Sequence, residues 1–180
     1  MLPISAVTPP IARTAPRPAL LLAGALALTA AAYARAPQGD FVWDDRLLIE
    51  RSSAVRASPE VGDLLVRPFW DRTEADTALG VYYRPLTTLT YWLDTRLSEG
   101  AAGWFHLVNV LVHLACVALV FHLAVRGGGS PLAAALAAAL FGLAPRLTES
   151  VAWISGRTDV LATAFALAAL AVHRPGRGAL

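Results

Sequence analysis

Four apolar segments alternate with polar stretches along this 180-residue chain. The apolar segments cover residues 18–34, 106–125, 131–144 and 160–172, and none of them contains Asp, Glu, Lys or Arg. A helix needs about 20 apolar residues to cross a bilayer core of ~30 Å. The second segment meets this length, the first is close to it, and the last two are short. The pattern predicts an all-α integral membrane protein with about four transmembrane helices.

The first apolar segment has two interpretations. Residues 1–17 contain Arg13, Arg17 and several prolines but no acid, which favours a cytoplasmic tail before a membrane anchor at 18–34. Basic residues before a short apolar core are also typical of a secretory signal peptide. Ala32-Tyr33-Ala34 and Ala34-Arg35-Ala36 would suit cleavage. The uncleaved anchor fits better with a chain in which more apolar segments follow.

Residues 35–104 form a long polar loop in which three stretches, 45–51, 60–65 and 86–97, predict short helices. In the last stretch leucines recur at near-helical spacing beside Tyr91 and Trp92, which indicates an amphipathic helix in the membrane interface. Aromatic residues recur through the whole loop, and such rings favour the headgroup level. We therefore expect an outer loop with short interfacial helices. Three further apolar helices within 105–172 and a basic tail at 173–180 follow it.

The charged residues are gathered in the loop. Of 13 acids, 11 lie between positions 40 and 99, whereas the loop holds 8 of the 15 arginines and is net −3. A nucleic-acid surface would be basic, so no nucleic-acid partner is expected. All the basic residues are arginine, which suggests a GC-rich genome. The single cysteine, Cys116, allows neither a disulfide nor a CxxC metal site.

Basic residues near the ends of the apolar segments predict the orientation in the membrane. With four spans, the arginines outside the long loop and the 145–159 junction fall on one side, which should be cytoplasmic; they are Arg13, Arg17, Arg126, Arg174 and Arg177. The long loop and the polar junction at 145–159 then share the opposite face. We expect the inner membrane of a bacterium, with residues 35–104 on the periplasmic side.

The two outer segments bring together residue types suited to group transfer. A carboxylate such as Asp44 or Asp45 can act as a general base on a hydroxyl. Arg84 and Arg157 can bind a phosphate through bidentate hydrogen bonds. Without further information, an Asp-Asp pair in a loop is more often a solvated turn or a helix cap. Glu149 and Arg157 could simply form a mutual salt bridge or mark helix termini at the interface.

The second apolar segment carries polar side chains on one face. At 100° per residue, His106, Asn109 and His113 lie within a narrow sector of a helix. Polar groups in a span usually face the protein interior or a cavity. They could line a cavity, but interhelical hydrogen bonds are the favoured interpretation.

Four stretches in order resemble the N-terminal part of membrane glycosyltransferases of the GT-C superfamily, in the protein O-mannosyltransferase-like or TMTC-like branch. They read FVWDD (41–45), YRPL (83–86), FHLVNVLVH (105–113) and TESVAWISGR (148–157). The resemblance covers about residues 20–172. It implies a sugar donor linked to polyprenyl phosphate and an acidic motif in the first outer loop that supplies the catalytic base.

The resemblance assigns expected roles to individual residues. Asp44 or Asp45 would deprotonate an acceptor hydroxyl, and Arg84 and Arg157 would bind the donor phosphate. A cavity-lining role is implied for His106, Asn109 and Glu149. Branches differ in their use of a divalent metal, so no metal or other cofactor is assigned. Membrane lipid and the lipid-linked donor are the expected partners.

The sequence departs from the family pattern in two respects. Many relatives carry His-Pro-Val-His before the Thr-Glu, whereas Ala144-Pro145-Arg146-Leu147 stands here. Relatives also have many more spans, so the chain is expected to hold only part of the enzyme domain. The alternative hypothesis is therefore a non-catalytic membrane protein, structural or binding, derived from that module.

Overall fold

The computed structural model describes residues 17–57, 61–66, 69 and 82–173, and no strand occurs among them. The longer helices are α1 (Pro18–Ala32), α4 (Pro85–Ser98), α5 (Ala102–Arg126), α6 (Pro131–Gly142) and α8 (Arg157–Val172). The shorter ones are η1 (Ala36–Gln38), η2 (Arg46–Glu50), α2 (Ser53–Arg56), α3 (Val61–Val66), η3 (Pro145–Leu147), α7 (Thr148–Ala152) and η4 (Ile154–Gly156). The predicted all-α fold class is confirmed.

Three stretches of the described residues are long and apolar enough to cross a membrane: Pro18–Gln38, Ala102–Arg126 and Ile154–Val172. A fourth is the pair Pro131–Gly142 and Pro145–Ala152, which is bent by 45° and counts as one broken span or a re-entrant loop. Pro145 explains the break, because proline disfavours a helical residue before it. The expectation of about four spans agrees with this arrangement.

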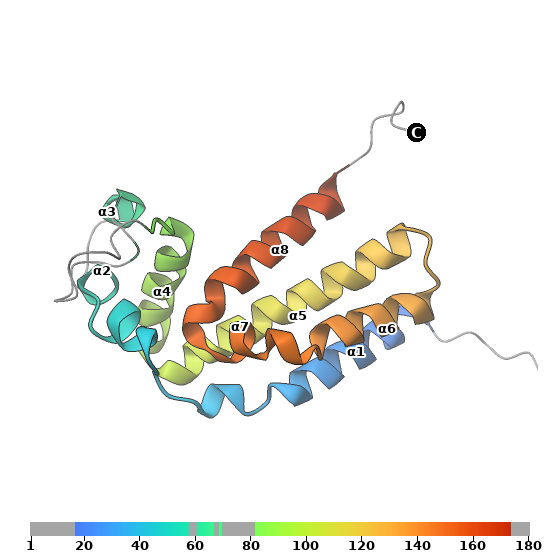
Figure 1. Ribbon diagram of the computed structural model, residues 1–180, viewed down its shortest axis with the longest axis horizontal. Coiled ribbons are helices and arrows are strands. Elements are labelled where there is room, and N and C mark those ends of the chain that lie inside the picture. Colours follow the sequence, from blue (N-terminus) through green and yellow to red (C-terminus); the bar gives the residue numbers. More distant parts are fainter. Residues whose placement is uncertain (1–16, 58–60, 67–68, 70–81, 174–180) are drawn as a thin grey trace, which may run out of the picture.

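Helix α5 is the centre of the bundle and packs against α1, α6 and α8 (Figure 1). Small residues bring α6 close to α1, as is common where helices meet in a membrane. A Cβ atom added at Gly142 would lie 2.2 Å from Thr29 Oγ1. The imidazole of His113 meets the Gly142 carbonyl oxygen at 3.1 Å, which joins α5 to α6 at the same level.

Helices α2, α3 and α4 pack together and form a cap at one end of the bundle (Figure 1). A buried apolar cluster joins this cap to the spans, and it includes Phe41, Ile49 and Tyr91 from the loop with Phe105 and Ile154 from the bundle. At the other end, the Arg126 guanidinium donates to the carbonyls of Ala171 and His173, which cap α8. The polar loop and the 145–159 junction therefore meet at the end opposite Arg126.

Several expectations fall on residues outside the described ranges. They are most of the tail at 1–17, most of the basic tail at 173–180, and Arg13, Arg174 and Arg177 among the orientation residues. The predicted loop helices at 45–51, 60–65 and 86–97 overlap with η2, α3 and α4. Among the described residues of the loop, α4 is the only helix of more than two turns, and Pro85 begins it, as expected for proline at the first helical position.

Candidate functional site

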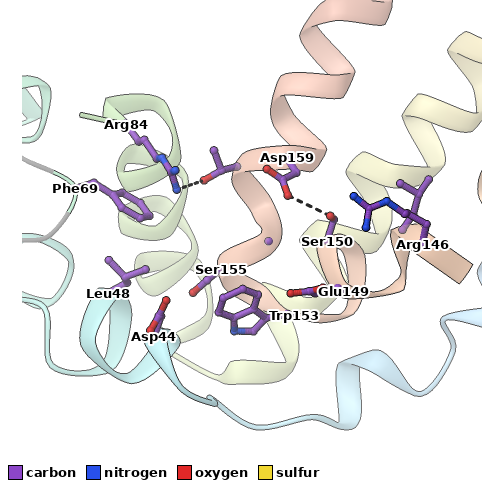
Figure 2. A pocket seen from close by; sticks show the side chains of 13 residues that line it. Asp44, Leu48, Phe69, Arg84, Arg146, Glu149, Ser150, Trp153, Ser155 and Asp159 are labelled. Atoms are coloured by element: carbon purple, nitrogen blue, oxygen red, sulfur yellow. Dashed lines mark hydrogen bonds between the residues drawn. The ribbon is translucent and has the colours of Figure 1, made fainter. Parts of the chain in front are cut away.

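A pocket of about 400 Å³ lies between the polar loop and the 145–159 junction (Figure 2). Its charged lining comes from both segments, with Asp44 and Arg84 from the first and Arg146, Glu149 and Asp159 from the second. The remaining lining residues are Leu48, Phe69, Leu147, Ser150, Trp153, Ser155, Gly156 and Thr158. The fold thus places residues that are about 100 positions apart in one concave, largely polar site.

Asp44 occupies a tight turn that begins at Val42. The Asp45 amide donates to the Val42 carbonyl at 2.9 Å, and Trp43 between them has φ = 48°. A non-glycine residue in this left-handed region is disfavoured by about 1–2 kcal/mol. Asp44 is half-buried and lines the pocket, and its carboxylate forms no hydrogen bond or ion pair with another described residue. The turn therefore presents a free carboxylate to the pocket.

Asp45 has the opposite environment. It is fully buried, and its Oδ1 accepts hydrogen bonds from the Ser155 amide at 2.9 Å and the Ser155 hydroxyl. Its Oδ2 accepts from the Val42 amide at 3.1 Å. Burial raises the pKa of Asp45 above its ordinary value, while the Ser155 and Val42 hydrogen bonds and nearby His106 oppose the shift. The predicted Asp44-Asp45 pair is therefore split into one pocket carboxylate and one buried carboxylate.

Arg84 lies at the start of α4 with its guanidinium toward the pocket (Figure 2). It donates to Thr158 Oγ1 at 3.4 Å, a weak contact, and its guanidinium carbon lies 5.0 Å from the centroid of the Phe69 ring. The ring holds the guanidinium plane while leaving donors for an anion. This position suits the phosphate contact predicted for Arg84, which stays a prediction.

Arg157 does not line the pocket, and its environment argues against the predicted phosphate contact. The side chain is fully buried in α8, with Nε donating to Asn109 Oδ1 at 2.7 Å and Nη2 to the Phe105 carbonyl at 2.7 Å. Nη1 forms a salt bridge with Asp94 and a weaker hydrogen bond to Thr90. The alternative salt bridge with Glu149 is wrong, because the partner is an acid of α4 that the sequence did not single out.

The polar face of α5 is used for packing rather than for the pocket. His106 Nδ1 meets the Ala152 carbonyl at 2.8 Å, and Asn109 Nδ2 donates to the Trp153 carbonyl at 2.9 Å. Neither residue is among the pocket lining, so the cavity-lining role predicted for them is not supported by the geometry. Glu149 does line the pocket, where it is exposed and forms no ion pair with another described residue.

Two charged pocket residues were missed by sequence reasoning as functional candidates. Arg146 is exposed in η3 and forms no hydrogen bond or ion pair with another described residue. Asp159 accepts from the Ser150 hydroxyl at 3.2 Å. The available signal for Arg146 was its position where the family pattern has Val, between two replaced histidines. For Asp159 the signal was an acid within the first turn of an apolar helix.

Among the described residues, no group of three or more His, Cys, Asp and Glu side chains is arranged to hold a metal ion. The pocket therefore combines the Asp44 carboxylate, which has no partner among the described residues, with the guanidinium groups of Arg84 and Arg146. Such a set can accept a proton from a hydroxyl and bind an oxyanion.

Comparison with known proteins identifies the relatives. The chain is 34% identical to the protein O-mannosyl-transferase F38B6.6 of Caenorhabditis elegans over 77% of its length and 21% of the relative's. It is 36% identical to human TMTC4 over 83% of its length and 22% of the relative's. Mouse TMTC1 is 37% identical over 88% of the chain and 18% of the relative. The chain is homologous to part of the TMTC protein O-mannosyl-transferases.

This homology confirms the resemblance to the TMTC-like branch. The chain spans about a fifth of the length of the curated relatives it matches. No family model and no solved structure matches it. The relatives' names give a reaction class, protein O-mannosyl transfer, which can be compared with the residues that line the pocket.

Proposed function

We propose that the pocket takes part in glycosyl transfer from a polyprenyl-phosphate sugar to a hydroxyl of an acceptor, such as a protein Ser or Thr. The observation that carries the proposal is the position of Asp44, a carboxylate without a protein partner among the described residues, in the same pocket as Arg84 and Arg146. The names of the relatives support mannose as the sugar and a protein as the acceptor.

In the proposed reaction, the oxygen of the acceptor hydroxyl attacks the anomeric carbon while Asp44 accepts the proton of that hydroxyl. The bond between that carbon and the phosphate oxygen breaks, and the lipid phosphate leaves with the bonding electron pair. Arg84 and Arg146 bind the phosphate and stabilise the charge that develops on it. Arg146 thereby replaces Arg157 in the phosphate role that the sequence had suggested.

The position of the pocket relative to the spans also suits a lipid-linked donor. A lipid-linked donor keeps its chain in the bilayer, and the pocket lies at the end of the spans, where a headgroup phosphate would be found. The bacterial inner membrane and the periplasmic position of residues 35–104 remain predictions; the relatives cited are animal proteins.

The test is transfer of labelled mannose from polyprenyl-phosphate mannose to a Ser/Thr peptide in membranes that carry this chain. We expect Asp44→Asn to lower the rate by about 10²–10⁴-fold, the usual contribution of a general base. Asp40→Asn is the matched control, because Asp40 is exposed in the same loop and its Oδ1 accepts only from the adjacent Phe41 amide.

Equal transfer by the wild type and Asp44→Asn would overturn the proposed role of Asp44. A wild-type chain that gives no transfer, although it binds the lipid-linked donor, would instead favour the non-catalytic binding protein.

A further inference from the structure

The buried carboxylate of Asp45 connects two parts of the chain that are 110 residues apart. One oxygen is bonded to Ser155 through both its amide and its hydroxyl, and the other is bonded to the Val42 amide. All three hydrogen bonds end on the Asp45 carboxylate. When this group is ionised, they are stronger than hydrogen bonds between neutral groups. The Asp45–Ser155 link thus connects the turn that bears Asp44 directly to the 145–159 junction.

On the loop side, the link supports an otherwise unfavourable turn. Asp45 is bonded to Val42 in both directions, amide to carbonyl and amide to carboxylate, and closes the turn around Trp43 and Asp44. Trp43 in its left-handed conformation needs such support, because strain of this kind persists only where surrounding contacts fix it. Movement of the Asp45 carboxylate would therefore displace the neighbouring Asp44.

On the other side, Ser155 belongs to a segment that the bundle holds firmly. The Tyr91 hydroxyl donates to the Ile154 carbonyl at 3.1 Å, and Asn109 donates to the carbonyls of Trp153 and Ile154. A Cβ atom added at Gly156 would lie 2.6 Å from the Ser150 carbonyl oxygen, so η4 is packed tightly against α7. Ser155 is thus a fixed reference point formed by α4, α5 and α7.

From this geometry we propose that Asp45 and Ser155 are positioning residues, which hold Asp44 at the pocket through the hydrogen bonds between them. The proposal rests on the proposed function for its effect on transfer. It also makes a structural claim that can be tested without any transfer. Loosening the link should free the 41–50 segment while leaving Arg84 and Arg146, which bind the donor, in place.

The experiment compares the wild type with Ser155→Ala, which removes the hydroxyl, and with Ser155→Thr, which keeps it. Ser98→Ala is the matched control, because its hydroxyl donates to the Asp94 carbonyl at 2.7 Å and does not line the pocket. Two quantities are measured for each variant in membranes or detergent: hydrogen exchange of the 41–50 amides and steady-state transfer of mannose from polyprenyl-phosphate mannose.

We expect Ser155→Ala to speed exchange in segment 41–50 and to lower kcat by about tenfold, the equivalent of one charge-assisted hydrogen bond. The KM for the donor should change little, because the phosphate contacts are kept. Ser155→Thr, which keeps the hydroxyl, should resemble the wild type in both quantities, and Ser98→Ala should alter neither.

Unchanged exchange in Ser155→Ala would overturn the link, whatever the transfer assay shows. Faster exchange with an unchanged kcat would overturn the positioning role. Absence of transfer in the wild type would refute the proposed function instead and, with it, the effect of the link on catalysis. The exchange comparison would still decide whether the link holds the turn.

Discussion

The buried cluster around Arg157 and the pocket beside it both use residues of the segment 153–157. They differ in whether their charged side chains are bonded to other residues. In the cluster, Arg157 is bonded to Asp94, Asn109, Thr90 and the Phe105 carbonyl, with the Tyr91 ring 4.9 Å from its guanidinium carbon. In the pocket, Asp44, Arg146 and Glu149 form no ion pairs with other described residues. A charged residue near a span thus holds the fold together where its polar atoms are bonded within the protein, as in Arg157, and is available to a ligand where they are not, as in Asp44.

Removing the acid of the buried cluster should have the largest effect. Asp94→Ala leaves the Arg157 guanidinium buried and uncompensated, and breaking a buried ion pair costs about 3–5 kcal/mol of stability. Thermal unfolding in detergent measures the loss. Glu50→Ala, which removes an exposed carboxylate of the same loop, is the control and should unfold like the wild type. An unaltered melting temperature for Asp94→Ala would show that the cluster does not hold the cap on the bundle.

Removing the pocket arginines should affect donor binding rather than folding. Arg84→Ala and Arg146→Ala should each raise the KM for polyprenyl-phosphate mannose by about tenfold, as expected for loss of one hydrogen bond to a charged group. The exposed Arg51→Ala serves as control for the loss of a positive charge from the protein. If the KM stays the same in both pocket variants, the arginines do not bind the phosphate.

The smallest effect concerns the pH dependence of stability. The pKa of Asp45 is raised on folding by burial, so the folded state binds its proton more tightly than the unfolded state does. Stability should therefore fall as the pH rises from about 4, the ordinary aspartate pKa, through the folded pKa. Asp45→Asn has no such titration. The measurement is the free energy of unfolding of both proteins as a function of pH. A difference between the two that does not change with pH would contradict the raised pKa of Asp45.

The helices were predictable because their signal is local. The apolar segment at 106–125 lies in α5, and the one at 18–34 lies in α1 except for its last two residues. Proline at positions 18, 85 and 131 begins three helices. The polar face of α5 was predictable as an inward-facing one for the same reason, since helical spacing alone places its residues together.

The site was only partly predictable, because its contacts join distant segments. Asp94 and Arg157 are 63 positions apart, and nothing in the spacing of either segment marks them as partners. Asp44 and Asp45 are adjacent, and only the turn at Trp43 decides that one faces the pocket and the other faces Ser155. The resemblance to a known family singled out Asp44 and Asp45 but did not indicate which of the two faces the pocket.

The split of the aspartate pair is tested most directly by measuring mannose transfer and melting temperature side by side for Asp44→Asn and Asp45→Asn. We expect Asp44→Asn to lose transfer while keeping the wild-type melting temperature, because its carboxylate has no protein partner among the described residues. Asp45→Asn should lower the melting temperature, since the amide nitrogen that replaces one carboxylate oxygen cannot accept a hydrogen bond. The division into one catalytic and one structural carboxylate would be contradicted if Asp44→Asn transferred at the wild-type rate, or if Asp45→Asn were as stable as the wild type.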